Sequence, residues 1–279
     1  MKGFRGCGCH NGAMSERSPE TSPRATAAEC LLRDDREGVV TLTLNRPRQY
    51  NALSREMLEA LHRELDSIAA DEAVRVVIVT GAGRAFCAGH DLKEMRALSS
   101  PEQVEKLFAL CSAMMQKLVA LPQPVIAAVN GVATAAGCQL AAQCDLAVAS
   151  EHARFAVSGV NLGLFCSTPS VALSRNISRK RAAEMLFTGE FIEAPVALDW
   201  GLVNRLAPPE RLMETAQELA NNLIAKPREV LALGKALFYR QLEADLASAY
   251  ADATRTIAGN MGCEAARQGV DAFLSKKPR

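Results

Sequence analysis

Apolar and polar residues alternate along the segment that follows Gly38. Val40, Leu42 and Leu44 stand at every second position with threonines between them, which is typical of a β-strand buried on one face. The turn-forming residues 45–47 then end the alternation. The pattern therefore predicts a strand that stops at about residue 44.

The next segment has the period of a helix. Ser54 can cap its start, and apolar residues recur on one face at spacings of three and four: Met57, Leu58, Leu61, Leu65 and Ile68. Residues 75–80 then form an apolar, β-branched run, the pattern of a strand covered on both faces in a parallel sheet. The first unit is predicted to be β-α-β.

The same order recurs further along the chain. The pattern predicts a helix over 102–121, a strand over 125–129, a short helix near Gly137 and a strand over 146–149. Alternation of this kind indicates an α/β fold with a parallel sheet. Beyond Pro208 strand patterns disappear, and the chain reads as helices.

We therefore divide the sequence into three parts. Residues 1–29 are rich in Gly, Ser, Pro and charge and are expected to be a disordered tail, with Met14 as an alternative start. Residues 30–207 form the predicted α/β core, and residues 208–279 form a helical C-terminal region.

The composition argues against some classes of binding partner. The chain has 279 residues with 32 Lys and Arg against 31 Asp and Glu, so it offers no net field for nucleic acid or an anionic membrane. Three Tyr and one Trp also leave few surfaces on which bases could stack. No apolar run approaches the roughly 18 residues of a membrane span. Nucleic-acid and membrane partners are not expected.

The cysteines point to a reducing compartment. There are nine, an odd number, and several lie inside apolar runs: Cys87, Cys111, Cys138, Cys144 and Cys166. The N-terminal segment lacks the apolar stretch of a secretory signal peptide, so we expect reduced thiols and a cytoplasmic location. Cys7, Cys9 and His10 fall short of the about four ligands of a closed zinc site, so no metal site is expected.

Two loops after buried strands carry the candidate chemistry, at the edge where open α/β sheets place ligands. The loop over 81–92 starts like a dinucleotide loop, but Phe86 replaces the third glycine and no helix pattern starts directly after Gly83. The loop over 130–140 passes through small residues into a helix, whose free N–H groups would stabilise an anion. Facing each other, the two loops would form an oxyanion hole.

An ordered series of segments resembles the crotonase (enoyl-CoA hydratase/isomerase) superfamily. The segments are residues 43–47, 51–53, 85–92, 124–131, 136–140 and 144–145, and the resemblance spans residues 36–279. Residues 159–161, 163–169 and 233–235 are similar to one branch of the superfamily in particular.

The resemblance implies an α/β fold built as a spiral of ββα turns, with a helical C-terminal region that forms trimers or hexamers. It implies acyl-CoA thioesters as ligands, with coenzyme A as part of the substrate and no other cofactor. The backbone N–H groups of His90 and Ala136 would form the oxyanion hole. Coenzyme A would lie against Arg48, Gln49 and Tyr50 and against Ala88, Asp91 and Leu92, and we expect Met95, Val132, Leu162 and Phe165 to line the acyl pocket.

The chain departs from the family's hydratases at two positions. Those enzymes carry glutamates where this sequence has Gln139 and Gly159. A glutamine amide cannot exchange a proton near neutral pH, and general acid–base catalysis is worth roughly 10²- to 10⁴-fold. Hydration is therefore expected to be slow. His90 is a candidate proton donor because an unperturbed histidine titrates near neutral pH, whereas Asp91 is expected to cap a helix and Asp145 to be structural.

Three functions remain open at this stage. The first is a lyase-type acyl-CoA enzyme of the hydratase family with weak or altered hydratase activity, or with decarboxylation of a malonyl-type thioester as its reaction. The second is a non-catalytic acyl-CoA binding protein. The third is a scaffold whose trimer surface serves other proteins.

Overall fold

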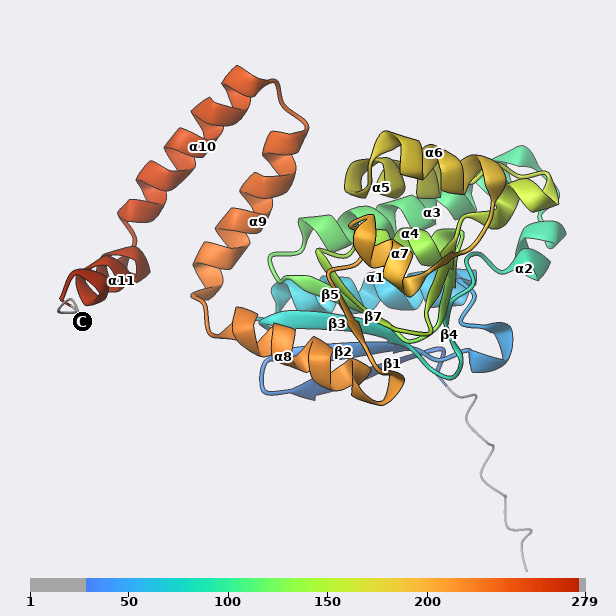
Figure 1. Ribbon diagram of the computed structural model, residues 1–279, viewed down its shortest axis with the longest axis horizontal. Coiled ribbons are helices and arrows are strands. Elements are labelled where there is room, and N and C mark those ends of the chain that lie inside the picture. The colour runs from blue at the N-terminus through green and yellow to red at the C-terminus, as the bar shows by residue number, and fades with distance from the viewer. Residues whose placement is uncertain (1–28, 276–279) are drawn as a thin grey trace, which may run out of the picture.

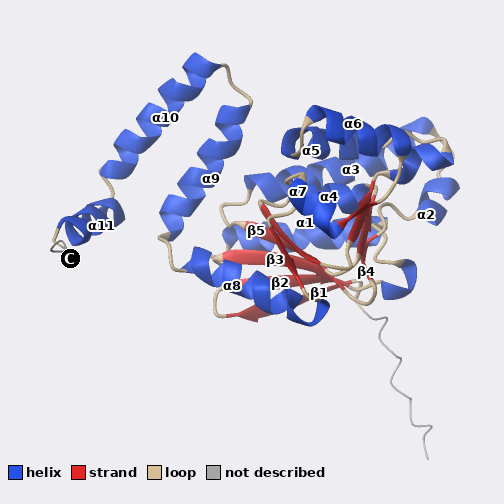
Figure 2. Ribbon diagram, viewed as in Figure 1, coloured by secondary structure: helices blue, strands red, loops and turns tan. Residues whose placement is uncertain are grey.

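A computed structural model describes residues 29–275, and its strands form two sheets (Figures 1 and 2). The larger sheet has six strands in the order β1-β2-β3-β5-β7-β10, all parallel except the β1–β2 pair. Its strands are β1 (Leu31–Arg36), β2 (Val39–Leu44), β3 (Val76–Gly81), β5 (Val125–Val129), β7 (Leu146–Ser150) and β10 (Arg205–Ala207).

The smaller sheet has four strands in the order β4-β6-β8-β9. They are β4 (Ala85–Cys87), β6 (Val132–Thr134), β8 (Arg154–Ala156) and β9 (Ile192–Glu193). From β3 to β8 consecutive strands go alternately to the larger and the smaller sheet, with helices between the pairs. The predicted α/β spiral of ββα turns is confirmed.

Helices follow the strand pairs. They are α1 (Arg55–Ala70), α2 (Leu92–Ala97), α3 (Pro101–Ala120), α4 (Ala136–Gln143), α5 (Ser167–Asn176), α6 (Arg179–Thr188) and α7 (Ala194–Asp199), with short 3-10 turns at Pro47–Gln49, Ser158–Leu162 and Pro209–Arg211. In α1 the predicted cap and face are both confirmed: the Ser54 side chain accepts from the Met57 N–H, and all five predicted apolar residues are buried.

Strand β3 shows why the central strands are apolar throughout. Val77 and Val79 belong to the main core, whereas Val76 and Ile78 belong to a second core on the opposite face of the sheet. The second face is covered by α8 (Leu212–Ile224), which contributes Leu212, Ala216 and Ala220 to that core. Strand β3 is therefore buried on both faces, as the sequence predicted for residues 75–80.

The last three helices extend away from the core as an arm (Figure 1). They are α9 (Arg228–Leu242), α10 (Leu246–Met261) and α11 (Glu264–Leu274), and none of their residues is buried. Large apolar side chains on the arm are more than half exposed, among them Phe238, Leu246, Tyr250, Ile257 and Phe273. The predicted helical C-terminal region is present, and its apolar surface has no cover within the described part of the chain.

One partly buried ionic cluster joins the arm to the core. The Lys235 Nζ in α9 donates to the Asp145 carboxylate at 2.7 Å and to the carbonyls of Leu118 and Gln123 at 2.8 and 3.0 Å. Asp145 also accepts from the Val125 N–H at 2.7 Å and from the Tyr239 hydroxyl at 2.8 Å. The structural role expected for Asp145 is confirmed, and α9 is fixed to the start of both β5 and β7.

The sequence did not predict β1 or the short strands of the smaller sheet. Strand β1 has the sequence LLRDDR, and most of its residues are exposed, so it lacks an alternating apolar pattern. Strands β4, β6 and β8 have three residues each, which is too short for a period of two to be visible. Strand β1 is specified by its hairpin with β2, and β4, β6 and β8 are specified by pairing with partners distant in the chain.

The described cysteines are free thiols, and six of them are buried: Cys30, Cys87, Cys111, Cys138, Cys144 and Cys166. Burial raises the pKa of Cys87 and Cys138 to about 12, so these thiols stay protonated at neutral pH. Cys7, Cys9 and His10 lie outside the described residues. Within residues 29–275, no three His, Cys, Asp or Glu side chains are grouped as metal ligands.

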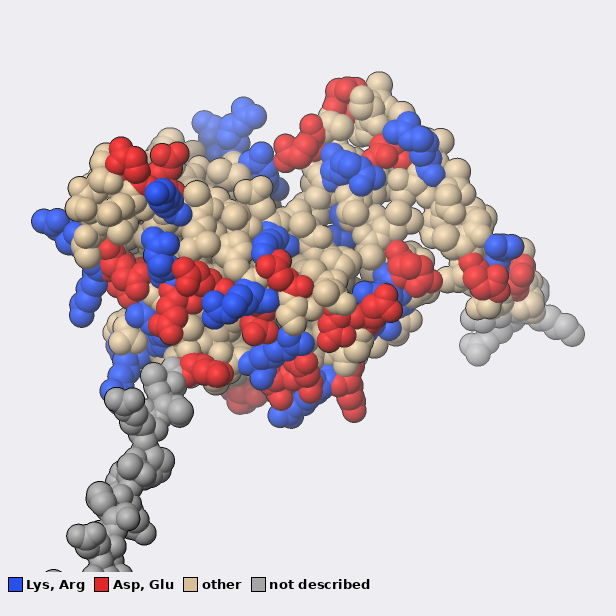
Figure 3. Space-filling model, turned by 180° about the vertical axis from the view of Figure 1, so that it is seen from behind, with Lys and Arg blue, Asp and Glu red and all other residues tan. Residues whose placement is uncertain are grey.

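Charge is distributed without a dominant sign on the face shown in Figure 3, where Lys and Arg alternate with Asp and Glu. None of the helices between residues 29 and 275 combines the length and apolarity needed to cross a membrane.

Candidate active site

The first site loop follows β4 and turns at Ala88-Gly89. Gly89 has φ +90°, a conformation that glycine adopts without strain. The Leu53 N–H donates to the Gly89 carbonyl at 2.7 Å, and the Asp91 N–H donates to the Leu53 carbonyl at 3.2 Å. Leu53 thus holds the loop on both sides of His90, whose own N–H finds no backbone acceptor in residues 29–275.

The second site loop leads from β6 into the start of α4. The Ala135 N–H donates to the Ala156 carbonyl at 2.9 Å, and the Gln139 N–H closes the first helical turn on the Ala135 carbonyl at 3.0 Å. The Ala136 N–H has no acceptor among the described backbone groups, as expected for the first residue of a helix. The loop therefore presents this N–H as a free donor.

The two loops lie in close contact. A Cβ atom added at Gly89 would lie 3.2 Å from the Ala136 nitrogen and 2.9 Å from the Ala135 Cβ. A Cβ added at Gly137 would lie 2.0 Å from the Cys87 carbonyl oxygen, so the start of α4 is packed directly on β4. The structure thus brings together the two backbone segments that the sequence assigns to an oxyanion hole.

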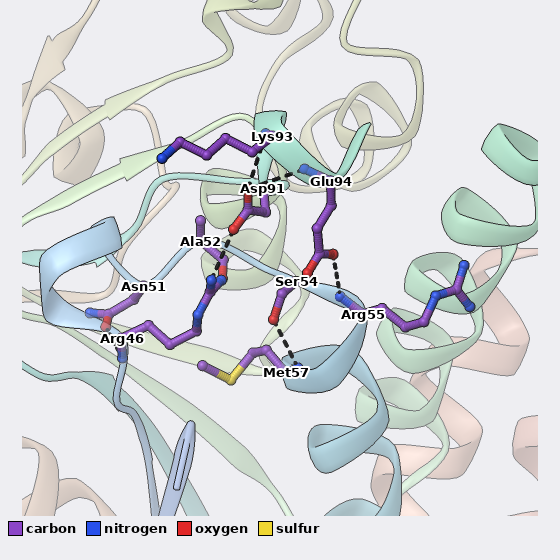
Figure 4. A network of polar contacts seen from close by, with 9 residues as sticks. All are labelled: Arg46, Asn51, Ala52, Ser54, Arg55, Met57, Asp91, Lys93 and Glu94. Atoms are coloured by element: carbon purple, nitrogen blue, oxygen red, sulfur yellow. Dashed lines mark hydrogen bonds and ion pairs between the residues drawn. The ribbon is translucent and has the colours of Figure 1, made fainter. Parts of the chain in front are cut away.

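A polar network around Asp91 fixes the end of the first loop (Figure 4). The Asp91 side chain accepts from the N–H groups of Lys93 and Glu94 and forms an ion pair with Arg46 at 2.9 Å. The expected cap is confirmed, and the carboxylate is already engaged by these donors. Its predicted contact with coenzyme A stays a prediction.

Asn51 is a positioning residue that sequence reasoning missed. It is fully buried; its Nδ2 donates to the carbonyls of Ala82 and Ala85 at 2.9 and 2.7 Å, and its Oδ1 accepts from the Arg46 N–H at 2.9 Å. Its positive φ of 56° after the Pro47 turn fits the tolerance of asparagine for that conformation. The available signal was an asparagine four residues after the predicted turn over 45–47.

The segment predicted to hold coenzyme A borders the first loop. Arg48 and Gln49 are exposed in the 3-10 turn, and the Ala88 N–H donates to the Tyr50 carbonyl at 3.0 Å. The Arg84 guanidinium donates to the Tyr50 hydroxyl and lies 4.5 Å from the centre of its ring. Cationic side chains at 48 and 84 therefore stand at the surface next to the turn.

Gln139 occupies the turn of α4 that follows Ala136. Its side chain is 4% exposed, and its Oε1 has no hydrogen-bond partner in the described chain. A buried acceptor without a donor is costly, so this amide is suited to a polar group supplied by a ligand or by water.

Gly159 lies in a loop that excludes a side chain. A Cβ atom there would lie 2.6 Å from the Leu164 carbonyl oxygen and 2.8 Å from the Cys166 Sγ. The same loop is closed by hydrogen bonds from the Gly159 N–H to Cys166 at 3.3 Å and from the Leu164 N–H to Gly159 at 3.0 Å. No carboxylate can be placed at 159 without moving this backbone.

The pKa of the His90 side chain differs from the expected value. Burial lowers its pKa to about 4, against a smaller opposing effect of the Leu53 carbonyl. The ring packs on Phe108 with centroids 4.6 Å apart, and neither ring nitrogen has a hydrogen-bond partner among the described residues. The expectation that His90 titrates near neutral pH is wrong, because desolvation disfavours the imidazolium. At pH 7 the ring is neutral.

The residues expected to line the acyl pocket differ in how far they are exposed. Met95 packs against the main core, and Val132 lies in β6, which pairs with β4 next to the first loop. Leu162 and Phe165 are 63% and 52% exposed. The structure thus leaves the latter two at the surface.

Two cavities lie elsewhere in the molecule. One, of about 270 Å³, is formed by residues of α6, β9 and α7, and the other, of about 320 Å³, lies between the end of α3 and α9. Neither is lined by a residue that the sequence assigns to the site.

Comparison with known proteins decides the family. A family model described as Enoyl-CoA hydratase/isomerase matches residues 34–279. The chain belongs to this family. Enoyl-CoA hydratase domain-containing protein 3 of rat is 42% identical over 269 residues, covering 96% of this chain and 88% of the relative. This agrees with the resemblance to one branch, which is confirmed.

Solved structures of enoyl-CoA hydratase/isomerase proteins have the same fold. The crystal structure of an enoyl-CoA hydratase from Mycobacterium smegmatis matches with a TM-score of 0.87 and 58% identity, covering 90% of this chain and 98% of that one. The human enoyl-CoA hydratase domain-containing protein 3 matches with a TM-score of 0.85 and 41% identity, covering 90% and 99%.

The cytoplasmic location expected from the sequence is wrong. The rat, mouse and human relatives, 41–42% identical to this chain, are all named mitochondrial proteins. The free thiols of the described chain do not separate the cytosol from an organelle that also keeps thiols reduced. The sequence signals used were therefore unable to make this distinction.

Proposed function

We propose that this member of the family binds acyl-CoA thioesters and stabilises the thioester enolate with the backbone N–H groups of His90 and Ala136. The observation that carries the proposal is a pair of backbone N–H groups that have no acceptor within residues 29–275, in two loops that touch at Gly89. Donors of this kind are fixed before the reaction starts, and removal of one is typically worth about 2.7–4 kcal/mol of transition-state stabilisation.

The side chains around these donors support a reaction that needs no strong protein base. Gln139 is not ionisable, residue 159 has no side chain, and burial holds the pKa of His90 near 4. Addition of water to an enoyl-CoA benefits from a group that moves a proton, so we infer weak hydration.

Decarboxylation of a malonyl-type thioester is the second candidate, favoured by the same lack of a base. The bond between the α-carbon and the carboxylate breaks, and its electron pair passes into the enolate, whose oxygen is held by the two N–H groups. Carbon dioxide leaves, and the α-carbon then takes a proton from water.

The test compares wild type with Gln139→Glu in a crotonyl-CoA hydration assay. Wild type is expected to be slow, and the variant faster by about 10-fold or more, because a carboxylate at 139 can move a proton. Gln139→Met is the control for loss of the amide alone and is expected to give no gain.

Release of carbon dioxide from malonyl-CoA and methylmalonyl-CoA by wild type is followed in parallel. Turnover there supports the second candidate, and binding without turnover of any thioester supports a non-catalytic acyl-CoA binding protein. Calorimetry that detects no binding of crotonyl-CoA or malonyl-CoA would overturn the proposal.

A further inference from the structure

Ala135 has a backbone conformation that L-residues rarely adopt. Its φ is 51° and its ψ is −121°. Tyr50 also has a positive φ, of 51°, but its ψ of 35° lies in the ordinary left-handed region, which Ala135 does not share. A side chain with a Cβ is strained at the angles of Ala135, and such strain persists only where the surroundings impose it.

The surroundings of Ala135 impose its conformation from three sides. Its N–H is bound to the Ala156 carbonyl in β8, and its carbonyl accepts from the Gln139 N–H. The following helix start is fixed because Gly137 packs on the Cys87 carbonyl oxygen. The peptide that joins Ala135 to Ala136 is thereby held in one orientation, and this peptide carries the Ala136 N–H.

The Ala135 methyl group lies on the side of the other loop. The space beside Gly89 is bounded by this methyl, by the Thr134 carbonyl oxygen and by the Ala136 nitrogen, which would lie 2.9, 3.0 and 3.2 Å from a Cβ at Gly89. Removal of the methyl would open space between the two loops at the point where they carry their free donors.

From this geometry we infer that Ala135 is a positioning residue. Its methyl group, held in a strained conformation against Gly89, sets the separation and direction of the His90 and Ala136 N–H groups. The inference rests on the proposed function, because it assigns to Ala135 the spacing of donors that the proposed function uses. The methyl group of Ala135 fixes the site geometry, while its strained conformation lowers the stability of the fold.

The test uses Ala135→Gly, with Ala142→Gly as a matched control. Ala142 lies in α4, the helix that begins directly after Ala135, and is buried, but helical geometry gives it no strain that glycine could relieve. Ala135→Gly is expected to keep or raise the melting temperature, whereas Ala142→Gly is expected to lower it.

The site readout is the enolate absorbance of acetoacetyl-CoA bound to the protein, titrated against pH. Wild type is expected to increase the enolate fraction over that of the free thioester. Ala135→Gly is expected to lower this preference by about 10-fold, because small displacements of fixed groups have large effects. Binding of butyryl-CoA, which forms no enolate under these conditions, is expected to be unchanged.

The two proposals fail in different ways. A wild-type protein that binds acetoacetyl-CoA without favouring its enolate overturns the proposed function. A wild-type protein that favours the enolate, together with an equal preference in Ala135→Gly, overturns the role of Ala135 and leaves the proposed function intact. A melting temperature well below wild type in Ala135→Gly would show that the conformation is not strained and would also overturn the inference.

Discussion

The environment of His90 illustrates how strongly burial can change a single residue. The backbone N–H of His90 lies at the candidate oxyanion hole. The imidazole ring packs on Phe108, and neither ring nitrogen has a hydrogen-bond partner in the described structure. A neutral imidazole at this place can pack and can accept or donate a hydrogen bond. It does not add a positive charge to the site at neutral pH.

This burial predicts a pH-dependent loss of stability. The pKa of His90 is about 4 in the folded protein and about 6.5 in the unfolded chain, so the unfolded state binds the additional proton as the pH falls between these values. The free energy of unfolding is unaffected by this group above pH 6.5. It falls by up to about 3 kcal/mol as the pH approaches 4.

Urea unfolding of wild type and His90→Phe at pH 7 and pH 4.5 measures this contribution. The variant keeps an aromatic ring against Phe108 and is expected to lose less stability on acidification. His152→Gln, at an exposed position, controls for the removal of one histidine. Equal losses in wild type and His90→Phe would contradict the prediction.

At the level of elements, the cluster of Lys235, Asp145 and Tyr239 connects α9 with the strands of the larger sheet. Burial lowers the pKa of Lys235, while the neighbouring Asp145 carboxylate opposes the shift. Asp145 follows α4 by two residues, so the cluster also joins the C-terminal arm to the helix that starts at the oxyanion donor.

Lys235→Met is expected to destabilise the fold by about 3 kcal/mol, because it removes one partner of a largely buried pair. Urea unfolding measures the change, and hydrogen exchange is expected to increase first in α9. Glu214→Gln, which breaks an exposed ion pair with Arg211, is the control and is expected to have little effect. Unchanged exchange in α9 with Lys235→Met would show that the cluster does not hold the arm.

The sequence predicted most elements whose apolar pattern is long enough to have a period. These include α1, α3, β2, β3, β5 and β7, because each buries one face against the main core or its two faces against the main and the second core. It missed β4, β6 and β8, which depend on partners distant in the chain. It also predicted that the two loops face each other, and the structure brings them into contact at Gly89. It could not show the strain at Ala135 or the burial of His90, since both arise from tertiary contacts.

At the scale of the whole molecule, the exposed apolar surface of the C-terminal arm predicts association. Residues of α10 such as Leu246, Tyr250 and Ile257 are 75%, 69% and 56% exposed, a pattern more typical of an interface than of a solvated helix. We expect the protein to sediment as a trimer or a hexamer. A monomer at micromolar concentration would contradict this expectation.

The double variant Leu246→Glu with Tyr250→Glu is expected to dissociate the assembly, because association would bury the new charges. Leu32→Glu, at an exposed apolar position in β1, is the matched control and is expected to leave the assembly intact. Sedimentation velocity of the three proteins, supported by circular dichroism for folding, makes the comparison.

The crowding around Gly159 also limits which substitutions this chain could acquire during evolution. The resemblance implies glutamates in the family's hydratases at the positions of Gln139 and Gly159, and this fold does not accept a glutamate equally well at the two positions. A glutamate at 139 needs one substitution on a helix turn that already holds a side chain of the same length. At 159 even a methyl group would collide with the Leu164 carbonyl oxygen. Carboxylates at both positions would require the loop around Gly159 to be rebuilt first, so single substitutions can introduce a glutamate at 139 but not at 159.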